Sequence, residues 1–143
     1  MWPRMTQELL NIVLVEDAAP DVFLVRQALA KDGLKFQLHV LDDGEKAVEF
    51  IEGLEQNEAT PCPDLVLLDL NVPKKAGDQV LEYIRKSRRC GRIPVVIVTS
   101  SDSPKDRSRV ALLGATQYFQ KPSKLDEFMK LGSLVRSVVN QSS

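Results

Sequence analysis

The chain has 143 residues, of which 43% are hydrophobic and 27% are charged. This composition is that of an ordinary globular protein and excludes a disordered, collagen-like or coiled-coil chain. With 19 basic and 20 acidic residues the net charge is -1, so no basic field favours binding to nucleic acid or to an anionic membrane. The length predicts one domain over 1–143, with a core over about 11–140 and flexible segments at 1–8 and in the last few residues.

Three apolar segments predict strands that are buried on both faces, because they are rich in Val, Ile and Leu and do not alternate with polar residues. These segments are residues 11–15, 64–68 and 94–98. Residues 36–41 and 116–119 mix polar and apolar side chains, which is typical of less buried outer strands. The pattern therefore predicts five strands, with the most apolar ones at the centre of a parallel sheet.

Amphipathic stretches with helical spacing alternate with these strands. They cover residues 20–31, 45–56, 78–88, 105–113 and 125–139. Five strands alternating with five helices predict an α/β fold, a doubly wound sandwich with right-handed crossovers.

Targeting signals are missing from the sequence. Uninterrupted aliphatic runs stay far below the roughly 20 residues that cross a bilayer. The first residues lack the basic-then-apolar plan of a signal peptide, which predicts a cytoplasmic protein. In that reducing compartment Cys62 and Cys90, which form no CxxC pair, are expected to be free thiols. Cys62 lies in the segment 57–63, which breaks any helix and is expected to be poorly ordered.

Polar residues follow four of the five predicted strands. They are Glu16 and Asp17, then Asp69, then Thr99 and Ser100, and finally Lys121. In an open parallel sheet, ligands bind outside the carboxyl ends of the strands, at the point where the strand order reverses. We therefore expect these side chains to share one crevice.

The chemistry of this crevice favours phosphoryl transfer. Clustered carboxylates repel one another and call for a cation, and an all-oxygen ligand set points to Mg²⁺. Asp69 can attack phosphorus to give an acyl phosphate, while Thr99 and Lys121 can bind phosphoryl oxygens. Each residue taken alone also fits a simple helix-capping role, so the interpretation depends on the whole set.

The ordered set resembles the receiver domain of two-component response regulators. The matching residues are Glu16-Asp17, LVLLDLNVP with Asp69 and Pro73, Gly77, PVVIVTSS with Thr99, and LGATQYFQKP with Lys121-Pro122. The resemblance covers about residues 12–139. It implies a flavodoxin-like fold with strand order 2-1-3-4-5, helices on both faces, and a stand-alone receiver without an output domain.

The resemblance also implies a role for each residue. Asp69 would accept a phosphoryl group from a histidine kinase. Mg²⁺ would be bound by Glu16, Asp17, Asp69 and the backbone carbonyl of Asn71. Lys121 would contact the phosphoryl group. The protein would then signal through protein–protein contacts and would not be an enzyme, apart from an intrinsic autophosphatase activity.

Further residues would transmit or tune the signal. Thr99 would contact the phosphoryl group and, with Tyr118, form the switch, although Tyr118 equally fits a plain core position. The side chains of Asn71 and Ser101 lie where the family tunes the phosphoryl lifetime. The Lys121-Pro122 peptide bond is expected to be cis.

Three further features are similar to the small regulators paired with phytochrome-type histidine kinases. They are the long connection GLEQNEATPCPD, the turn DLNVPKKAG and the extended last helix. This similarity implies a light-responsive kinase as phosphodonor, an unknown downstream protein, and a homodimer through the face of the fourth and fifth helices. No nucleic-acid or membrane partner is expected.

Two other functions stay open. An Mg²⁺-dependent aspartate-phosphate phosphohydrolase shares the strand-end Asp, but it needs a second acid two residues later, where Asn71 stands. An intermediate receiver in a multistep phosphorelay has the same residues. His39 is the only histidine and fits a half-exposed strand position, so the phosphodonor histidine must lie on another protein.

Overall fold

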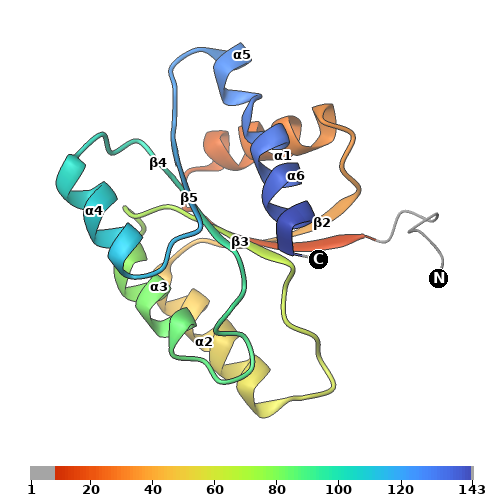
Figure 1. Ribbon diagram of the computed structural model, residues 1–143, viewed down its shortest axis with the longest axis vertical. Coiled ribbons are helices and arrows are strands. Elements are labelled where there is room, and N and C mark those ends of the chain that lie inside the picture. Colours follow the sequence, from red (N-terminus) through yellow and green to blue (C-terminus); the bar gives the residue numbers. More distant parts are fainter. Residues whose placement is uncertain (1–8, 143) are drawn as a thin grey trace.

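The computed structural model describes residues 9–142 of the chain (Figure 1). Its strands form one parallel sheet in the order β2-β1-β3-β4-β5. They are β1 (Leu10–Val15), β2 (Phe36–Leu41), β3 (Leu65–Leu68), β4 (Val95–Thr99) and β5 (Gln117–Gln120). The predicted doubly wound sheet and its strand order are confirmed. The flexibility predicted for 1–8 lies outside the described residues, whereas the last helix continues to Ser142.

Helices cover both faces of the sheet, as predicted. They are α1 (Ala19–Lys31), α2 (Gly44–Gln56), α3 (Gly77–Arg85), α4 (Pro104–Leu112), α5 (Leu125–Phe128) and α6 (Leu131–Ser142). Buried side chains of α2, α3 and α4 share one apolar cluster with the sheet. Buried side chains of α1, α5 and α6 share a second cluster on the opposite face.

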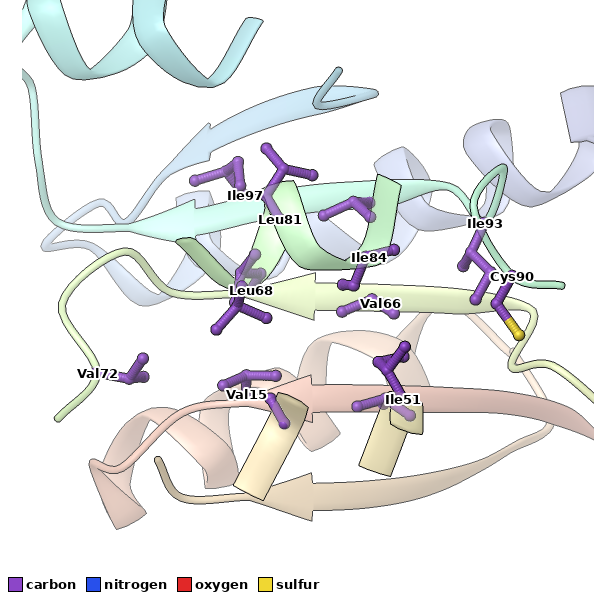
Figure 2. Packing of buried hydrophobic residues seen from close by; sticks show 14 of the residues in the cluster. Val15, Ile51, Val66, Leu68, Val72, Leu81, Ile84, Cys90, Ile93 and Ile97 are labelled. Atoms are coloured by element: carbon purple, nitrogen blue, oxygen red, sulfur yellow. The ribbon is translucent and has the colours of Figure 1, made fainter. Parts of the chain in front are cut away.

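The central strands supply both clusters because successive side chains of a strand point to opposite faces. In β3, Val66 and Leu68 belong to the cluster under α2 and α3, as Figure 2 shows. Leu65 and Leu67 belong to the cluster under α1 and α6. Burying each of these aliphatic side chains contributes roughly 1.5–3 kcal/mol, which explains why this strand is apolar throughout.

The predicted helix 125–139 is divided in two, so the expectation of one long last helix is wrong. The backbone N–H of Lys130 bonds to Glu127 O, and that of Gly132 bonds to Met129 O, which tightens the chain into a turn between α5 and α6. At Gly132 an added Cβ would lie 2.3 Å from Ala28 O. The glycine therefore lets α6 approach the backbone of α1 closely.

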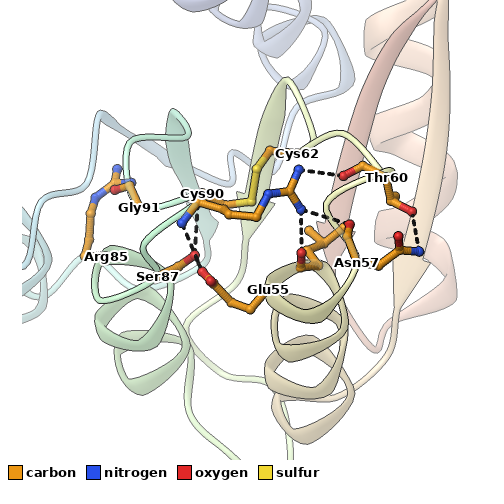
Figure 3. Close-up of a disulfide and its surroundings, with 10 residues drawn as sticks. Glu55, Asn57, Thr60, Cys62, Arg85, Ser87, Cys90 and Gly91 are labelled. Carbon is orange, nitrogen blue, oxygen red and sulfur yellow. Dashed lines mark hydrogen bonds between the residues drawn. A yellow bond between two sulfur atoms is a disulfide. The ribbon is translucent and has the colours of Figure 1, made fainter.

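The prediction of two free thiols is also wrong, because Cys62 and Cys90 form a disulfide (Figure 3). The connection after α2 folds against the connection after α3, and this brings the two Cα atoms to 5.7 Å, within the range that a disulfide spans. The prediction relied on the compartment and on the absence of a CxxC pair, neither of which reports the distance between two loops.

Candidate functional site

The polar residues predicted at the strand ends converge at the carboxyl edge of the sheet. Glu16 directly follows β1, Asp69 follows β3, and Lys121 follows β5. β1 lies between β2 and β3, so the chain order reverses beside Glu16 and Asp69. The crevice thus stands where open α/β sheets bind ligands.

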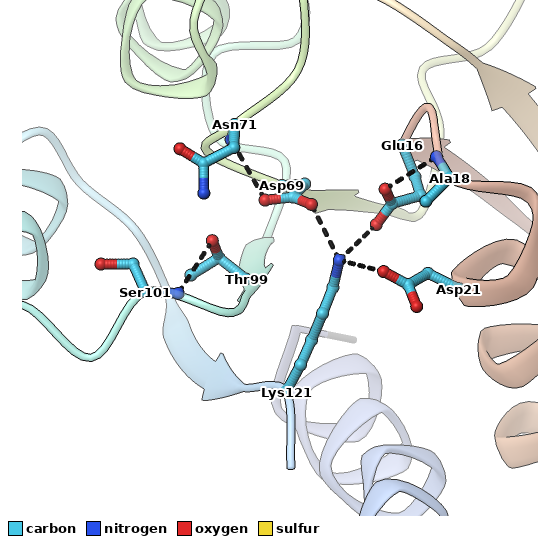
Figure 4. Close-up of polar contacts among 8 residues, drawn as sticks. All are labelled: Glu16, Ala18, Asp21, Asp69, Asn71, Thr99, Ser101 and Lys121. Atoms are coloured by element: carbon cyan, nitrogen blue, oxygen red, sulfur yellow. Dashed lines mark hydrogen bonds and ion pairs between the residues drawn. The ribbon is translucent and has the colours of Figure 1, made fainter. Parts of the chain in front are cut away.

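Lys121 is the centre of this crevice (Figure 4). Its Nζ atom donates to Glu16 Oε1 at 2.7 Å, to Asp69 Oδ2 at 2.8 Å and to Asp21 Oδ2 at 2.7 Å. The side chain of Lys121 is only 8% exposed, and that of Glu16 is 2% exposed. Three carboxylates therefore share one ammonium group that is largely excluded from water.

Asp21 belongs to the site, and the sequence reasoning missed it. It lies in the first turn of α1, which begins directly after the loop that carries Glu16 and Asp17. A helix that follows a parallel strand starts at the carboxyl edge of the sheet, so the third acid of EDAAPD was a usable signal. Glu16, Asp21 and Asp69 face the ammonium, and Asp17 adds a fourth carboxylate in the same loop, so a divalent cation would leave the site with a negative charge.

The Mg²⁺ ligand set expected from the sequence is only partly assembled. Glu16 and Asp69 face each other across Lys121, but Asp17 is exposed and outside these ion pairs. Within residues 9–142 no group of three His, Cys, Asp or Glu side chains is arranged to hold a metal ion. The backbone N–H of Asn71 donates to Asp69 Oδ1 at 3.1 Å, so both carboxylate oxygens of Asp69 have donors.

The environment moves the pKa values of these groups in different directions. Burial raises the pKa of Glu16 and outweighs the hydrogen bonds from Lys121 and the Ala18 N–H. At Asp69 burial also favours the neutral acid, but the hydrogen bonds from Lys121 and the Asn71 N–H together lower its pKa. Burial works to lower the pKa of Lys121, yet its three carboxylate partners raise it. At neutral pH the nucleophile candidate Asp69 is therefore an anion beside a firmly protonated lysine.

Thr99 and Tyr118 contact the same loop between β4 and α4. Thr99 is fully buried, and its Oγ1 accepts from the Ser101 N–H at 3.4 Å. The Tyr118 hydroxyl donates to Ser101 O at 2.8 Å, and the Arg107 guanidinium lies 4.1 Å from the centre of the Tyr118 ring. Tyr118 also packs against the core cluster, as its alternative interpretation as a core residue predicts, while its switch role stays a prediction.

The expected cis bond at Lys121-Pro122 is not found, because all peptide bonds within the described residues are trans. Trans is the favoured isomer of an X–Pro bond by about 0.5–1 kcal/mol. Lys121 reaches its three carboxylates with this trans bond.

Comparison with known proteins gives the class to which this site belongs. The chain matches the response regulator receiver domain family over residues 12–131, and it belongs to that family. It is 37% identical over 120 residues to the response regulator Rcp1 of Synechocystis sp., covering 84% of this chain and 82% of that protein. The predicted receiver domain is thus confirmed, and phosphorylation-dependent signalling is typical of this family.

Two solved structures extend this likeness. The phosphorylated cyanobacterial phytochrome response regulator RcpA superimposes with a TM-score of 0.83 at 29% identity, covering 95% of this chain and 97% of that chain. The Mn²⁺-bound form of Rcp1 gives a TM-score of 0.78 at 35% identity, covering 89% of this chain and 91% of that chain. The family is one of phosphoacceptors rather than of phosphohydrolases, which leaves the rival enzymatic function without support. No helix among residues 9–142 has the length and apolar character of a membrane span.

Proposed function

We propose that this chain works as a single receiver domain whose Asp69 accepts a phosphoryl group from a histidine kinase in the presence of Mg²⁺. The observation that carries the proposal is the setting of Asp69, which is 6% exposed at the end of β3 with donors on both carboxylate oxygens. These donors fix the orientation of the carboxylate and keep it ionised. An ionised, oriented carboxylate is the form that attacks phosphorus.

The transfer step uses Asp69 as nucleophile. One of its oxygens forms a bond to phosphorus while the bond from phosphorus to the histidine nitrogen of the kinase breaks, and the imidazole leaves. Lys121 already lies 2.8 Å from Asp69 Oδ2 and can bind the oxygens of the incoming group. The fully buried Thr99 hydroxyl would be a further donor. The donor histidine must come from the partner because His39, the only histidine, lies on β2.

The donor set of the site fits Mg²⁺, which prefers oxygen ligands. Glu16, Asp17, Asp69 and the Asn71 carbonyl would hold it, and the existence of an Mn²⁺-bound form of the relative Rcp1 supports a divalent cation here. When bound, the metal supplies positive charge for the phosphoryl oxygens. The excess of carboxylates over Lys121 provides the attraction for this cation.

The direct test is a measurement of intact mass after incubation with acetyl phosphate and Mg²⁺. We expect a gain of one phosphoryl group that hydroxylamine removes, as acyl phosphates require. A protein that gains no mass, or a phosphoprotein that resists hydroxylamine, would contradict the proposed function.

Replacing Asp17 with alanine should weaken Mg²⁺ binding by about tenfold or more, because it removes one of the few carboxylate ligands. The fold should be retained, since Asp17 is exposed and lies outside the ion pairs of Lys121. Titration calorimetry measures the affinity. Glu58→Ala is the matched control, an exposed acid in the α2–β3 connection at the other edge of the sheet, and it should bind Mg²⁺ like the wild type. Equal affinities of the two variants would remove Asp17 from the ligand set.

We further propose that Thr99 and Tyr118 relay phosphorylation to α4. Their shared contact, Ser101, also donates its hydroxyl to Asp106 Oδ2 in the first turn of α4 at 2.6 Å. A Thr99 side chain drawn toward the phosphoryl group would loosen this loop and change the surface around it.

Thr99→Ala should accept the phosphoryl group but respond less to it. Hydrogen exchange over residues 102–119, with and without a phosphoryl mimic, should change in the wild type and change far less in the variant. Ser133→Ala, which removes an exposed hydroxyl on α6, should respond like the wild type. If Thr99→Ala also responded like the wild type, the relay would run through Lys121 or the loop after Asp69.

The likeness to RcpA supports a phytochrome-type kinase as the donor. We propose that the protein is cytoplasmic and has autophosphatase activity. It would pass the signal to a downstream protein that is unknown, and it would form a homodimer through the face of α4 and the last helices. A place as an intermediate receiver in a phosphorelay is the second candidate. Transfer of label from the phosphorylated chain to a histidine phosphotransfer domain would favour that candidate.

A further inference from the structure

The disulfide joins two connections at the amino edge of the sheet, opposite the edge that carries Asp69. Cys62 lies in the connection from α2 to β3, and Cys90 lies in the connection from α3 to β4. Cys90 is 2% exposed, whereas Cys62 is half-buried. Cys62 is therefore the more accessible residue of the pair.

Arg89 holds the same two connections together without using either sulfur, through hydrogen bonds that include Asn57 and Thr60, both labelled in Figure 3. Its guanidinium donates to the backbone oxygens of Leu54, of Asn57 at 3.2 Å and of Thr60 at 2.7 Å. All three acceptors belong to the end of α2 and the connection that follows it. A charged donor bound to three carbonyl groups is a strong constraint on that connection.

Glu55 and Ser87 complete this constraint. The Glu55 carboxylate accepts from the Ser87 hydroxyl and, at 3.1 Å, from the Arg89 N–H. Ser87 Oγ in turn accepts from the Cys90 N–H at 2.9 Å. We call Glu55, Ser87 and Arg89 the polar strap. The strap therefore positions the backbone of Cys90 and binds the connection that carries Cys62 independently of the sulfur–sulfur bond.

We propose that Cys62 and Cys90 form a reversible exchange site for small-molecule disulfides, and that reduction loosens the connection 57–64 around Cys62 while the polar strap keeps the two cysteines within reach of each other. The residues on both sides of Cys62, Pro61 and Pro63, line a cavity of about 420 Å³ between this connection and β2. The cavity gives the connection space to move once the sulfur bond no longer holds it.

The exchange balances as two thiol–disulfide steps. The Cys62 thiolate attacks one sulfur of glutathione disulfide, whose sulfur–sulfur bond breaks and releases one glutathione thiolate. The Cys90 thiolate then attacks the Cys62 sulfur of the mixed disulfide and releases the second glutathione. The protein loses two electrons and two protons, and glutathione disulfide gains both to become two glutathione thiols. Excess glutathione reverses both steps.

The test places the purified full chain in mixtures of glutathione and glutathione disulfide. Free thiols are then blocked with iodoacetamide, and intact mass separates the dithiol from the disulfide form. We expect the same midpoint ratio of glutathione to glutathione disulfide whether the experiment starts from the dithiol or from the disulfide form. Hydrogen exchange of residues 57–64 should be on the order of tenfold faster in the dithiol form. Phosphoryl gain by acetyl phosphate should be the same in both forms. The proposal would be overturned if the two thiols never paired or if the reduced chain unfolded. Equal hydrogen exchange of residues 57–64 in the two forms would also overturn it.

Two arginine variants test the polar strap. Arg89→Ala should shift the midpoint by about tenfold toward the dithiol, because the cysteines lose the charged hydrogen bonds that align them. Arg88→Ala removes the exposed neighbouring arginine and should leave the midpoint in place. Equal redox midpoints in the two variants would show that the polar strap does not align the cysteines for disulfide formation.

Discussion

Asp69→Asn should gain no phosphoryl group from acetyl phosphate and Mg²⁺, to the limit of detection by intact mass. An amide is a far poorer nucleophile than a carboxylate, while its size and shape are nearly the same. The amide keeps one acceptor oxygen, for Lys121 or for the Asn71 N–H, and leaves the apolar core unchanged, so the domain should remain folded. The loss would therefore report on chemistry rather than on folding.

Asp21→Asn is the matched control for this experiment. Asp21 and Asp69 accept from the same Lys121 ammonium at 2.7 and 2.8 Å, and each substitution removes one negative charge from the crevice. Only Asp69 stands at the end of β3 with its second oxygen fixed by a backbone donor. Asp21→Asn should thus still gain one phosphoryl group, at an altered rate. Asp69 would not be the phosphoacceptor if Asp69→Asn still gained a phosphoryl group. The same conclusion would follow if only Asp21→Asn failed to gain one.

The sequence predicted the site well where a single rule decides the geometry. Glu16, Asp69 and Lys121 follow parallel strands and Thr99 ends one, and the carboxyl ends of parallel strands must meet at one edge. Asp21 was missed because it reaches the same edge from a helix, and the periodicity of a helix does not show which end faces a ligand.

Features that depend on contacts between loops or helices could not be predicted in this way. The turn between α5 and α6 requires the close approach of Gly132 to the Ala28 carbonyl, which no local pattern contains. The pairing of Cys62 with Cys90 requires the folded positions of two connections. Both are consequences of tertiary packing rather than of local preference.

Lys121→Met should lower the free energy of unfolding at pH 7 by about 3–5 kcal/mol in the absence of divalent cations, because removing one partner of a buried ion pair leaves uncompensated charge. Met keeps most of the aliphatic volume, so the loss reports on the ammonium group. Glu16 and Asp69 are at least as buried as Lys121 itself, and their carboxylates would face each other without a cation. Urea denaturation measures the difference, and Mg²⁺ should restore part of it by binding between the acids.

The pH dependence of this loss has a definite sign. In the wild type the lowered pKa of Asp69 means that its contribution to stability is present above the usual value of 3.8 and is lost as the pH falls through the folded value. In Lys121→Met the buried acids lack that support, so protonation relieves their repulsion instead. The deficit of the variant should therefore shrink as the pH falls from 7 toward 4.

Lys130→Met is the control, because Lys130 pairs with Glu127 on the exposed surface of the chain. A solvated surface ion pair contributes little to stability, so this variant should unfold like the wild type and show no rescue by Mg²⁺. A Lys121→Met deficit that stayed constant with pH, or that Mg²⁺ left unchanged, would mean that Lys121 stabilises the fold through packing. The four acids would then tolerate one another without a cation, and the electrostatic argument for Mg²⁺ in this crevice would fail with it.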